Sequence, residues 1–365
     1  MAESDTAVVT PPGAENAAVT AVVPGADPLV PTTRHPALLV VPLLVAGVAG
    51  LLVATMVLTD ANAVVRLVLG GVALLALYLG LRIAGTAIWG PRFDLGLWLS
   101  LGWLALVIVS AAIADLLPLA ESKNVSKTLG TPTLQRPDLF SEHPLGTDNQ
   151  GLDILGGVIY GARVSLIIGI GAVLIGMTVG GTIGIAAGYF RGKLETVVNV
   201  LTDSMLAFPP LILLLGMVAV LEPSVRNVTI ALALLNIPTY IRLSRANTLV
   251  YAQREFVLAA RALGDRNRNI IFRELLPNVL LPVVSFAFLI VAVLIVAEAS
   301  LSFLGLSVQR PNPTWGNMIA AGQDNFDDHP HLVFVPGAVL FLTVFAFNRV
   351  GDRARELWDT RQAKL

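Results

Sequence analysis

Eight stretches of this chain are apolar over a length that reaches or approaches what is needed to cross a lipid bilayer. A hydrocarbon core about 30 Å thick requires roughly 20 consecutive apolar residues in a helix. Because a helix satisfies its own backbone hydrogen bonds in lipid, the pattern predicts an all-α integral membrane protein. The predicted spans lie near residues 37–58, 64–89, 95–118, 164–188, 204–222, 228–246, 279–303 and 331–348. The fifth and sixth are short and contain prolines, so their limits are the hardest to place.

The composition supports the same class of protein. Charged residues make up 13% of the chain, whereas a soluble domain carries about a quarter. The mean hydropathy is +0.76. A net charge of -1 argues against a broad basic surface for nucleic acid. The chain has no cysteine, which excludes disulfides, thiol catalysis and iron–sulfur clusters.

The distribution of Lys and Arg orients the spans, because cytoplasmic loops carry an excess of both. With eight spans and an inner N-terminus, 17 of the 24 basic residues lie on the inner side. Both termini and the arginine-rich segment 251–277 are therefore predicted to be cytoplasmic. Two long segments, 119–163 and 304–330, fall outside; they either receive something there or only close helix ends. Trp315 in the second is suited to an interfacial anchor.

Four glycines recur every fourth residue along the fourth predicted span. They are Gly176, Gly180, Gly184 and Gly188. At 3.6 residues per turn they form one bare ridge, on which a second backbone can approach closely. The ridge predicts a tight helix contact inside a bundle or a dimer. The alternative is the general abundance of glycine in membrane helices.

Sites for chemistry are scarce in this sequence. The stretch GYFRGKLE fails the phosphate-loop pattern at Ala187 and Leu194, so this chain should bind no nucleotide. The cluster DNFDDHPHL (324–332) matches no ligand spacing, so no metal site and no catalytic residue are assigned. Glu298 is a carboxylate in an apolar span, which costs a few kcal/mol unless it faces a cavity or partner. It is either a pathway or gate residue or an interfacial residue at headgroup level.

The segment EFVLAARALGDRNRNIIFRELLPNVLLPV, residues 255–283, is predicted to form two short polar helices between spans. Phe256, Ala259, Ala260 and Leu263 share one narrow apolar stripe, with Glu255 beside it. Because alanine offers little area, the stripe is too small to be a core by itself. It predicts a helix gripped by another protein, although a helix lying on lipid headgroups is the alternative.

The two helices should be separated at Gly264. A glycine there suits the left-handed residue that ends a helix, and Asp265 can cap the next one. Ile270, Ile271 and Leu275 give the second helix its own apolar side. Pro277 is expected to end that helix before the following span.

This segment resembles the EAA loop of the membrane subunits of ATP-binding-cassette importers. The pattern is carried by Ala259-Ala260, Gly264 and Leu276-Pro277. Further stretches resemble the peptide/nickel permease family, in particular its dipeptide and oligopeptide C-type members. They are HPLGTDNQGLDILGGVIYGARVSLIIG (143–169), GYF (188–190), DSMLAFPPLILLL (203–215) and EASLSFLGLSVQRPNPTWGNMI (298–319).

The resemblance implies a permease subunit of a binding-protein-dependent importer for di- or oligopeptides in the bacterial plasma membrane. It implies four kinds of partner: the lipid bilayer, a second homologous permease, two cytoplasmic ATPases that bind ATP and Mg²⁺, and an extracytoplasmic substrate-binding protein. The segment from Glu255 to Pro277 would be the coupling helices that carry ATPase closure into the spans. Leu258 departs from the family, which often has the Glu of Glu-Ala-Ala there; Leu152 and Gly156-Gly157 depart in the outer stretch.

The implied organisation has four parts. They are a disordered cytoplasmic tail (1–36), two additional spans (37–93), a six-span permease domain (94–352) and a cytoplasmic C-terminal tail (353–365). Rival readings keep the family with another cargo (nickel, glutathione, a sugar or an antimicrobial peptide) or invoke an ion-coupled secondary transporter. The second rival should show more intramembrane charges than Glu298 alone. A membrane scaffold without transport is a third.

Overall fold

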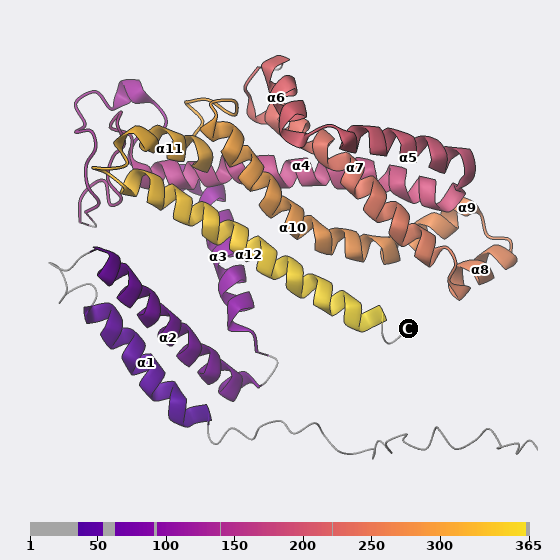
Figure 1. Ribbon diagram of the computed structural model, residues 1–365, viewed down its shortest axis with the longest axis horizontal. Coiled ribbons are helices and arrows are strands. Elements are labelled where there is room, and N and C mark those ends of the chain that lie inside the picture. The colour runs from indigo at the N-terminus through magenta and orange to yellow at the C-terminus, as the bar shows by residue number, and fades with distance from the viewer. Residues whose placement is uncertain (1–35, 54–62, 91–92, 139, 221, 363–365) are drawn as a thin grey trace, which may run out of the picture. The chain divides into compact units, whose positions relative to one another are not determined.

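A computed structural model describes residues 36–365 except 54–62, 91–92, 139, 221 and 363–365 (Figure 1). The predicted disordered tail thus lies outside the described residues, except at Pro36. The α-helices are α1 (Pro36–Leu52), α2 (Ala63–Trp89), α3 (Leu95–Ala112), α4 (Ile154–Phe190), α5 (Gly192–Ala207), α6 (Pro210–Val220), α7 (Val225–Tyr251), α8 (Glu255–Ala262), α9 (Asn267–Asn269), α10 (Leu276–Phe303), α11 (Trp315–Gly322) and α12 (His331–Gln362). Helical turns occur at Ala114–Leu116, Val125–Lys127 and Gln323–Asn325, and a π-helical segment, η4, at Ile270–Leu275. The described chain contains no β-strand, which confirms the all-α class.

The chain divides into two compact units, residues 1–94 and 95–365. In the first unit, α1 and α2 form an antiparallel hairpin whose helices approach closely at glycines. A Cβ added at Gly47 would lie 2.8 Å from the backbone nitrogen of Leu77, and one at Gly80 would lie 2.9 Å from the side chain of Leu44. Most of the large side chains of this hairpin are exposed and apolar, as expected of helices that face lipid.

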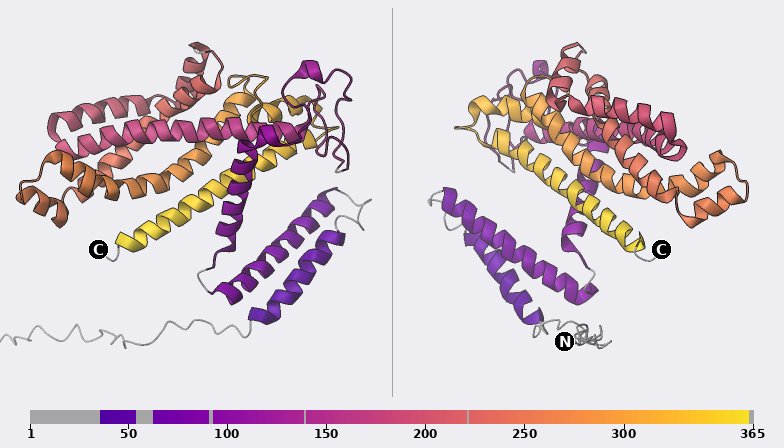
Figure 2. Two further views of the ribbon diagram at one scale, coloured as in Figure 1. Left: turned by 180° about the vertical axis from the view of Figure 1, so that it is seen from behind. Right: turned by 45° about the vertical axis from the view of Figure 1, so that its right-hand side comes forward.

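Six elements of the second unit correspond to the six predicted spans of the permease domain: α3, α4, the α5–α6 pair, α7, α10 and α12. By length and composition, α3, α4, α10 with its leading turns, and α12 can each cross a membrane. The α5–α6 pair passes the same criterion as one broken span, whereas α7, although 27 residues long, does not pass it. Figure 2 shows α10 and α12 side by side, and α4 running along α7. The described helices therefore match the expected arrangement, a core of six elements preceded by two additional helices.

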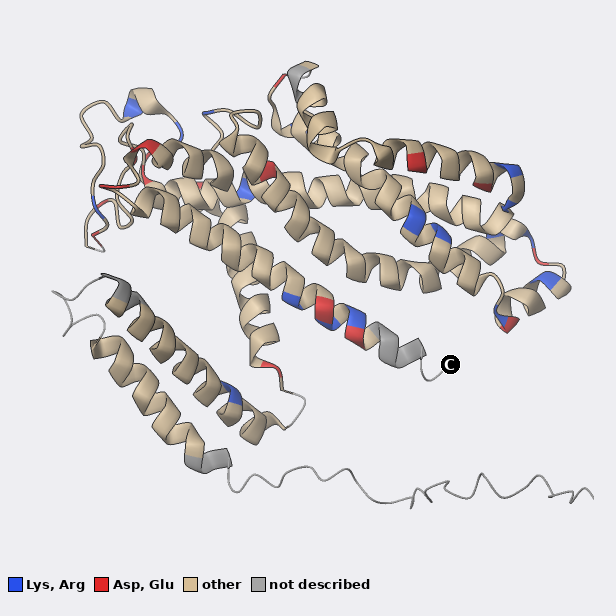
Figure 3. Ribbon diagram, viewed as in Figure 1, with Lys and Arg blue, Asp and Glu red and all other residues tan. Residues whose placement is uncertain are grey.

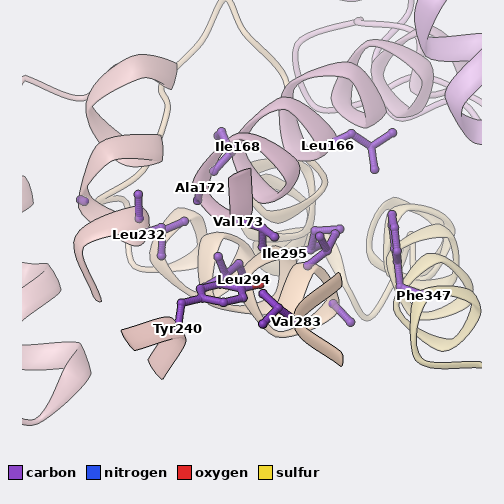
Figure 4. Packing of buried hydrophobic residues seen from close by; sticks show 14 of the residues in the cluster. Leu166, Ile168, Ala172, Val173, Leu232, Tyr240, Val283, Leu294, Ile295 and Phe347 are labelled. Carbon is purple, nitrogen blue, oxygen red and sulfur yellow. The ribbon is translucent and has the colours of Figure 1, made fainter. Parts of the chain in front are cut away.

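The core of the second unit lies where these helices meet. Figure 4 shows buried side chains from four helices converging: Leu166, Ile168, Ala172 and Val173 of α4, Leu232 and Tyr240 of α7, Val283, Leu294 and Ile295 of α10, and Phe347 of α12. The ring of Tyr240 packs edge-on against Phe286 of α10, with centroids 6.2 Å apart. The buried side chains of α4, α7, α10 and α12 thus form one hydrophobic cluster.

The fifth predicted span is not a straight helix. α5 and α6 are bent by 86° with respect to each other. The bend falls at Phe208 and Pro209, and Phe208 has an extended backbone. Because a residue that precedes proline disfavours the helical region, the Pro209-Pro210 pair ends α5 there, and α6 starts anew at Pro210. By contrast, α7 continues through Pro238.

The fourth span begins ten residues before the apolar stretch that predicts it. Asp153 caps α4, because its side chain accepts a hydrogen bond from the backbone N–H of Gly156 over 2.7 Å. Arg163 lies in this leading part and is held by the carbonyl of Ala111, 2.8 Å away, and by Asp115. Hydropathy missed these first ten residues because they include polar side chains, such as Arg163, whose hydrogen bonds are made inside the protein.

Candidate functional site

α8 is attached to the second unit by one side and leaves the other side open. The side chain of Val257 is fully buried in the core, and Ala260 packs half-buried against that core. Phe256 and Leu258 are 39% and 49% exposed. Since residues three apart lie on one face of a helix, Val257 and Ala260 form a narrow anchored side. The wide side of α8 is exposed in the described part of the chain.

The predicted apolar stripe is divided between these two sides. Of Phe256, Ala259, Ala260 and Leu263, only Ala260 faces the core, and Leu263 is 88% exposed. Sequence analysis missed Val257, the residue that anchors the helix. The sequence did contain a signal for Val257, namely its three-residue spacing to Ala260. The longer apolar stripe from Phe256 to Leu263 was chosen over this shorter pattern.

Gly264 ends α8 in the left-handed conformation, with φ +79°. Its N–H donates to the carbonyl of Arg261 over 3.1 Å, and the N–H of Asp265 donates to the carbonyl of Ala260 over 3.1 Å. These two bonds make a Schellman ending. The carboxylate of Asp265 then accepts from the backbone N–H of Arg266 and from the amide of Asn269, over 2.8 and 2.9 Å. These four hydrogen bonds fix the reversal between α8 and α9.

The expectation that Pro277 ends the second helix is wrong. The chain stays helical from α9 through η4 into α10, so Asn267–Phe303 forms one membrane-length element. Pro277 falls in the first turn of α10, where its missing N–H is tolerated. The N–H of Leu276 donates to the carbonyl of Ile271, five residues back, and this wider turn precedes the proline. A movement of α9 would thus pass directly into α10.

Tyr189, at the end of α4, connects the α8–α9 segment (residues 255–269) to the spans. Its hydroxyl donates to the side-chain oxygen of Asn267 over 2.8 Å. The guanidinium of Arg261 lies 5.2 Å from the centre of its ring, a cation–π contact. Tyr189 itself is buried. It belongs to the GYF stretch, and nothing in the sequence alone indicated that α4 ends against α8 and α9.

The glycine ridge of α4 lies directly against the backbone of α7. A Cβ added at Gly180 would be 2.6 Å from the carbonyl oxygen of Ile237, and one at Gly184 would be 2.5 Å from that of Ile241. At Gly176 and Gly188 the nearest atoms would be 3.3 Å and 2.9 Å away, again from α7. The contact is therefore made within the chain, along four turns of α4.

Basic residues gather on α8, α9 and the adjoining parts of α5 and α7 (Figure 3). Two of the arginines on α7 are paired with carboxylates of α5. Arg242 contacts Asp203 over 2.6 Å, and Arg245 forms a short ion pair with Glu195. These pairs fix α5 to α7 beside the glycine contact.

Glu298 is fully buried, which contradicts its placement at headgroup level. Its carboxylate accepts hydrogen bonds from the hydroxyls of Ser302 and Ser307, over 2.7 and 3.0 Å, and from Ser165 of α4 over 3.4 Å. The hydroxyl of Ser302 also lies 3.1 Å from that of Thr314, which caps α11. The carboxylate thus ties α4, α10 and the start of α11 together, rather than facing open space.

The segments around α11 form a second polar end of the unit. Arg310 contacts Asp148 and Gln150, each over 2.6 Å. His143 lies 3.1 Å from Asp153; burial raises the pKa of the Asp153 carboxyl, while its bonds to Gly156 and His143 oppose that rise.

Trp315 is not the interfacial anchor that was expected. Its side chain is fully buried, and the indole N–H donates to the carbonyl of Val158 over 3.1 Å. One nitrogen of His331 lies 3.1 Å from the carbonyl oxygen of Gln135. No group of three or more potential ligands that could hold a metal ion occurs in the described ranges.

The C-terminal half of the chain, residues 180–364, matches the family described as binding-protein-dependent transport system inner membrane component. The chain is 37% identical over 260 residues to the dipeptide transport system permease protein DppC of Alkalihalophilus pseudofirmus, covering 71% of this chain and 85% of that protein. It is 38% identical over 221 residues to the glutathione transport system permease protein GsiD of Pectobacterium atrosepticum, covering 60% and 73%.

A similar match, 37% over 258 residues, links it to a putative peptide transport system permease protein of Brucella suis, covering 71% and 86%. Among solved structures, it resembles an inward-facing form of the MetNI methionine ABC transporter, with 18% identity and a TM-score of 0.47, over 55% of this chain and 95% of that one. The sequence matches confirm the family resemblance. The chain belongs to the family of binding-protein-dependent transport system inner membrane components.

Proposed function

We propose that this chain is the permease subunit of an ATP-driven importer that moves di- or oligopeptides across the bacterial plasma membrane. The relatives named for dipeptide and peptide transport support this cargo. The excess of Lys and Arg around α8 and at the C-terminal end supports cytoplasmic termini and a cytoplasmic α8. A second homologous permease would complete the route, and a substrate-binding protein would deliver peptide to the opposite side, where α11 lies.

ATP and Mg²⁺ would be bound by two partner ATPases. This chain lacks a phosphate loop in its sequence, so the energy has to enter through a contact surface. The α8–α9 segment suits that role. The observation that carries the proposal is its construction: a helix with one buried anchor, Val257, a free wide side, and a continuous helical path from α9 into α10. A force that a partner applies to the exposed side of α8 would thus be transmitted through α9 to α10 and the other spans.

Gly264 offers the sharpest test of this coupling role. Valine in the left-handed region costs about 2 kcal/mol, so Gly264→Val should reorient α8 against α9. Asparagine tolerates that region, which makes Gly264→Asn the matched control. A Cβ at Gly264 would meet nothing within 4 Å, so neither variant crowds the fold. We expect Gly264→Val to lose peptide uptake at least about tenfold, with a normal amount of assembled protein in the membrane.

Bulky replacement of Ala260 should also abolish uptake. This test is less selective, because Ala260 packs against the core and a larger side chain would unseat α8 as well. Normal uptake by Gly264→Val would contradict the coupling role of the α8–α9 segment.

Glutathione is the second candidate cargo, because relatives named for glutathione transport match this chain at similar identity. Glutathione is itself a short peptide with a free thiol, so both cargoes fit one route. Selection would rest largely with the binding protein. Calorimetric titration of that protein with dipeptides and with glutathione decides between the two cargoes. If the binding protein bound neither ligand, both cargo assignments would be wrong.

A further inference from the structure

An open hollow lies beside α8, between it and the end of α4. It is lined by Tyr189, Arg191, Ala252, Gln253, Leu258 and Arg261. Tyr189 and Arg191 come from the junction of α4 and α5, and the other four come from the end of α7 and from α8. The hollow thus sits where the spans meet the α8–α9 segment. The function proposed above does not account for it.

Two arginines of this hollow are not neutralised by any carboxylate in the described part of the chain. Neither Arg191 nor Arg261 forms an ion pair within the described part of the chain, whereas Arg242 and Arg245 are each paired with a carboxylate of α5. The guanidinium of Arg261 is positioned by the ring of Tyr189. Arg191 is one of the two described non-glycine residues with positive φ, at +53°. Among the described residues, these two positive charges are therefore unpaired at the hollow, and Arg191 is held there at a conformational cost of about 1 kcal/mol or more.

We propose that this hollow receives a carboxylate side chain, Asp or Glu, of the ATPase that binds α8. This inference rests on the proposed coupling function and specifies its chemistry. Guanidinium groups bind carboxylates through charge-assisted hydrogen bonds, and a contact shielded by a partner is stronger than an exposed one. The positive charge at the hollow thus matches an acidic partner surface.

The rest of the lining favours a protein over a lipid phosphate. Leu258 is half-exposed at the hollow, and Phe256 and Leu263 expose apolar surface on the same helix and its end. Aromatic side chains and arginine with adjacent apolar area are typical of the centre of protein interfaces.

The test is charge reversal in the complete importer, with all partner subunits present. Arg191→Glu and Arg261→Glu are made separately, and Arg355→Glu on the exposed end of α12 is the matched control. The affinity of the ATPase for the detergent-solubilised permease is measured at several salt concentrations. We expect each reversal in the hollow to weaken the ATPase at least about tenfold, and the control to leave it unchanged.

Arg191→Glu is the more decisive of the two variants, because Arg261→Glu also removes the contact with the Tyr189 ring. Arg191→Lys keeps the charge and should keep most of the affinity. Arg191→Glu with unaltered ATPase affinity would overturn the proposal.

Reconstitution distinguishes the lipid alternative. Uptake is measured in vesicles of phosphatidylcholine alone and with phosphatidylglycerol added. If Arg191→Glu loses only the response to the anionic lipid while the ATPase stays bound, the hollow takes a lipid phosphate and the proposal is wrong. If Gly264→Val blocks uptake while both reversals leave the ATPase bound, this inference fails and the proposed function stands. If Gly264→Val transports normally, the proposed function fails whatever the reversals do.

Discussion

The α4–α7 contact and the α8–α9 segment differ in how tightly they are packed, although both belong to the second unit. Along α4–α7 the backbones touch, because four glycines leave no side chain between them. α8, by contrast, buries one valine fully and leaves most of its residues exposed. Small residues are how membrane helices obtain close packing, since apolar burial drives little association in lipid. A segment with little burial has a low free energy of local opening.

This difference in packing suggests how a force on the α8–α9 segment could be transmitted to the spans. A stiff contact transmits displacement with little loss, and a loosely held segment can adapt to a partner. The two meet at Tyr189, which ends α4 and bonds α9 through Asn267. A second route runs through η4 into α10 without a break. If the comparison is right, damage to α4–α7 should lower the stability of the whole unit, and damage to α8–α9 should lower uptake alone.

The largest effect is expected from Gly184→Val. Its Cβ would lie 2.5 Å from the carbonyl oxygen of Ile241, a backbone atom that cannot move aside. We expect the free energy of unfolding to fall by about 3 kcal/mol or more. The measurement is thermal unfolding of the purified subunit in detergent. Gly102→Val on α3 is the control, because nothing lies within 4 Å of its Cβ, and it should unfold like the unaltered chain. Equal stability of the two variants would refute close packing at α4–α7.

An intermediate effect is expected from Val257→Ala. Removing two buried methyl groups should weaken the attachment of α8 by about 2 kcal/mol. Because Val257 is the only buried residue of α8, α8 should detach locally while the rest of the core stays folded, and the unfolding temperature of the unit should barely change. Amide hydrogen exchange of residues 255–263 should accelerate, and uptake should fall. Leu258→Ala, at a half-exposed position, should leave exchange unaltered. A drop in unfolding temperature as large as that of Gly184→Val would mean that α8 unfolds together with the rest of the core.

The smallest effect is expected from Tyr189→Phe. The variant keeps the ring beneath Arg261 and loses one hydrogen bond to Asn267, worth about 1 kcal/mol. Exchange in α9 should rise modestly, with the rest of the unit unchanged. Asn267→Ala should have the same effect, and the double variant should add nothing to either. Additive effects would show that the two side chains act separately.

Sequence was informative where a local rule determines the structure. The four-residue spacing of Gly176, Gly180, Gly184 and Gly188 indicated a bare ridge, because helix geometry alone places them on one face. The left-handed Gly264 followed from helix-ending rules in the same way. Most of the spans followed from hydropathy, although α7 is not apolar enough to pass as a span by composition.

Sequence was misleading where contacts between distant segments decide. Trp315 is aromatic near a span end, yet α4 supplies a carbonyl for its indole and buries it. Glu298 gains hydroxyls from residues up to 133 positions away, which no local pattern reveals. Pro277 would end an isolated helix, but the wider turn of η4 before it keeps the path continuous. The partner of the ridge, α7, could not be chosen over another helix without the fold.

Cross-linking from α8 tests the central claim most directly. The chain has no native cysteine, so Leu263→Cys gives a single thiol at an 88% exposed position. Leu116→Cys, 84% exposed near the start of α4, serves as the control at the other end of the unit. In the purified complex, the account predicts that a thiol-reactive cross-linker on residue 263 captures the ATPase and that capture changes with ATP, whereas residue 116 captures none. Absence of any nucleotide-hydrolysing subunit at residue 263 would contradict it.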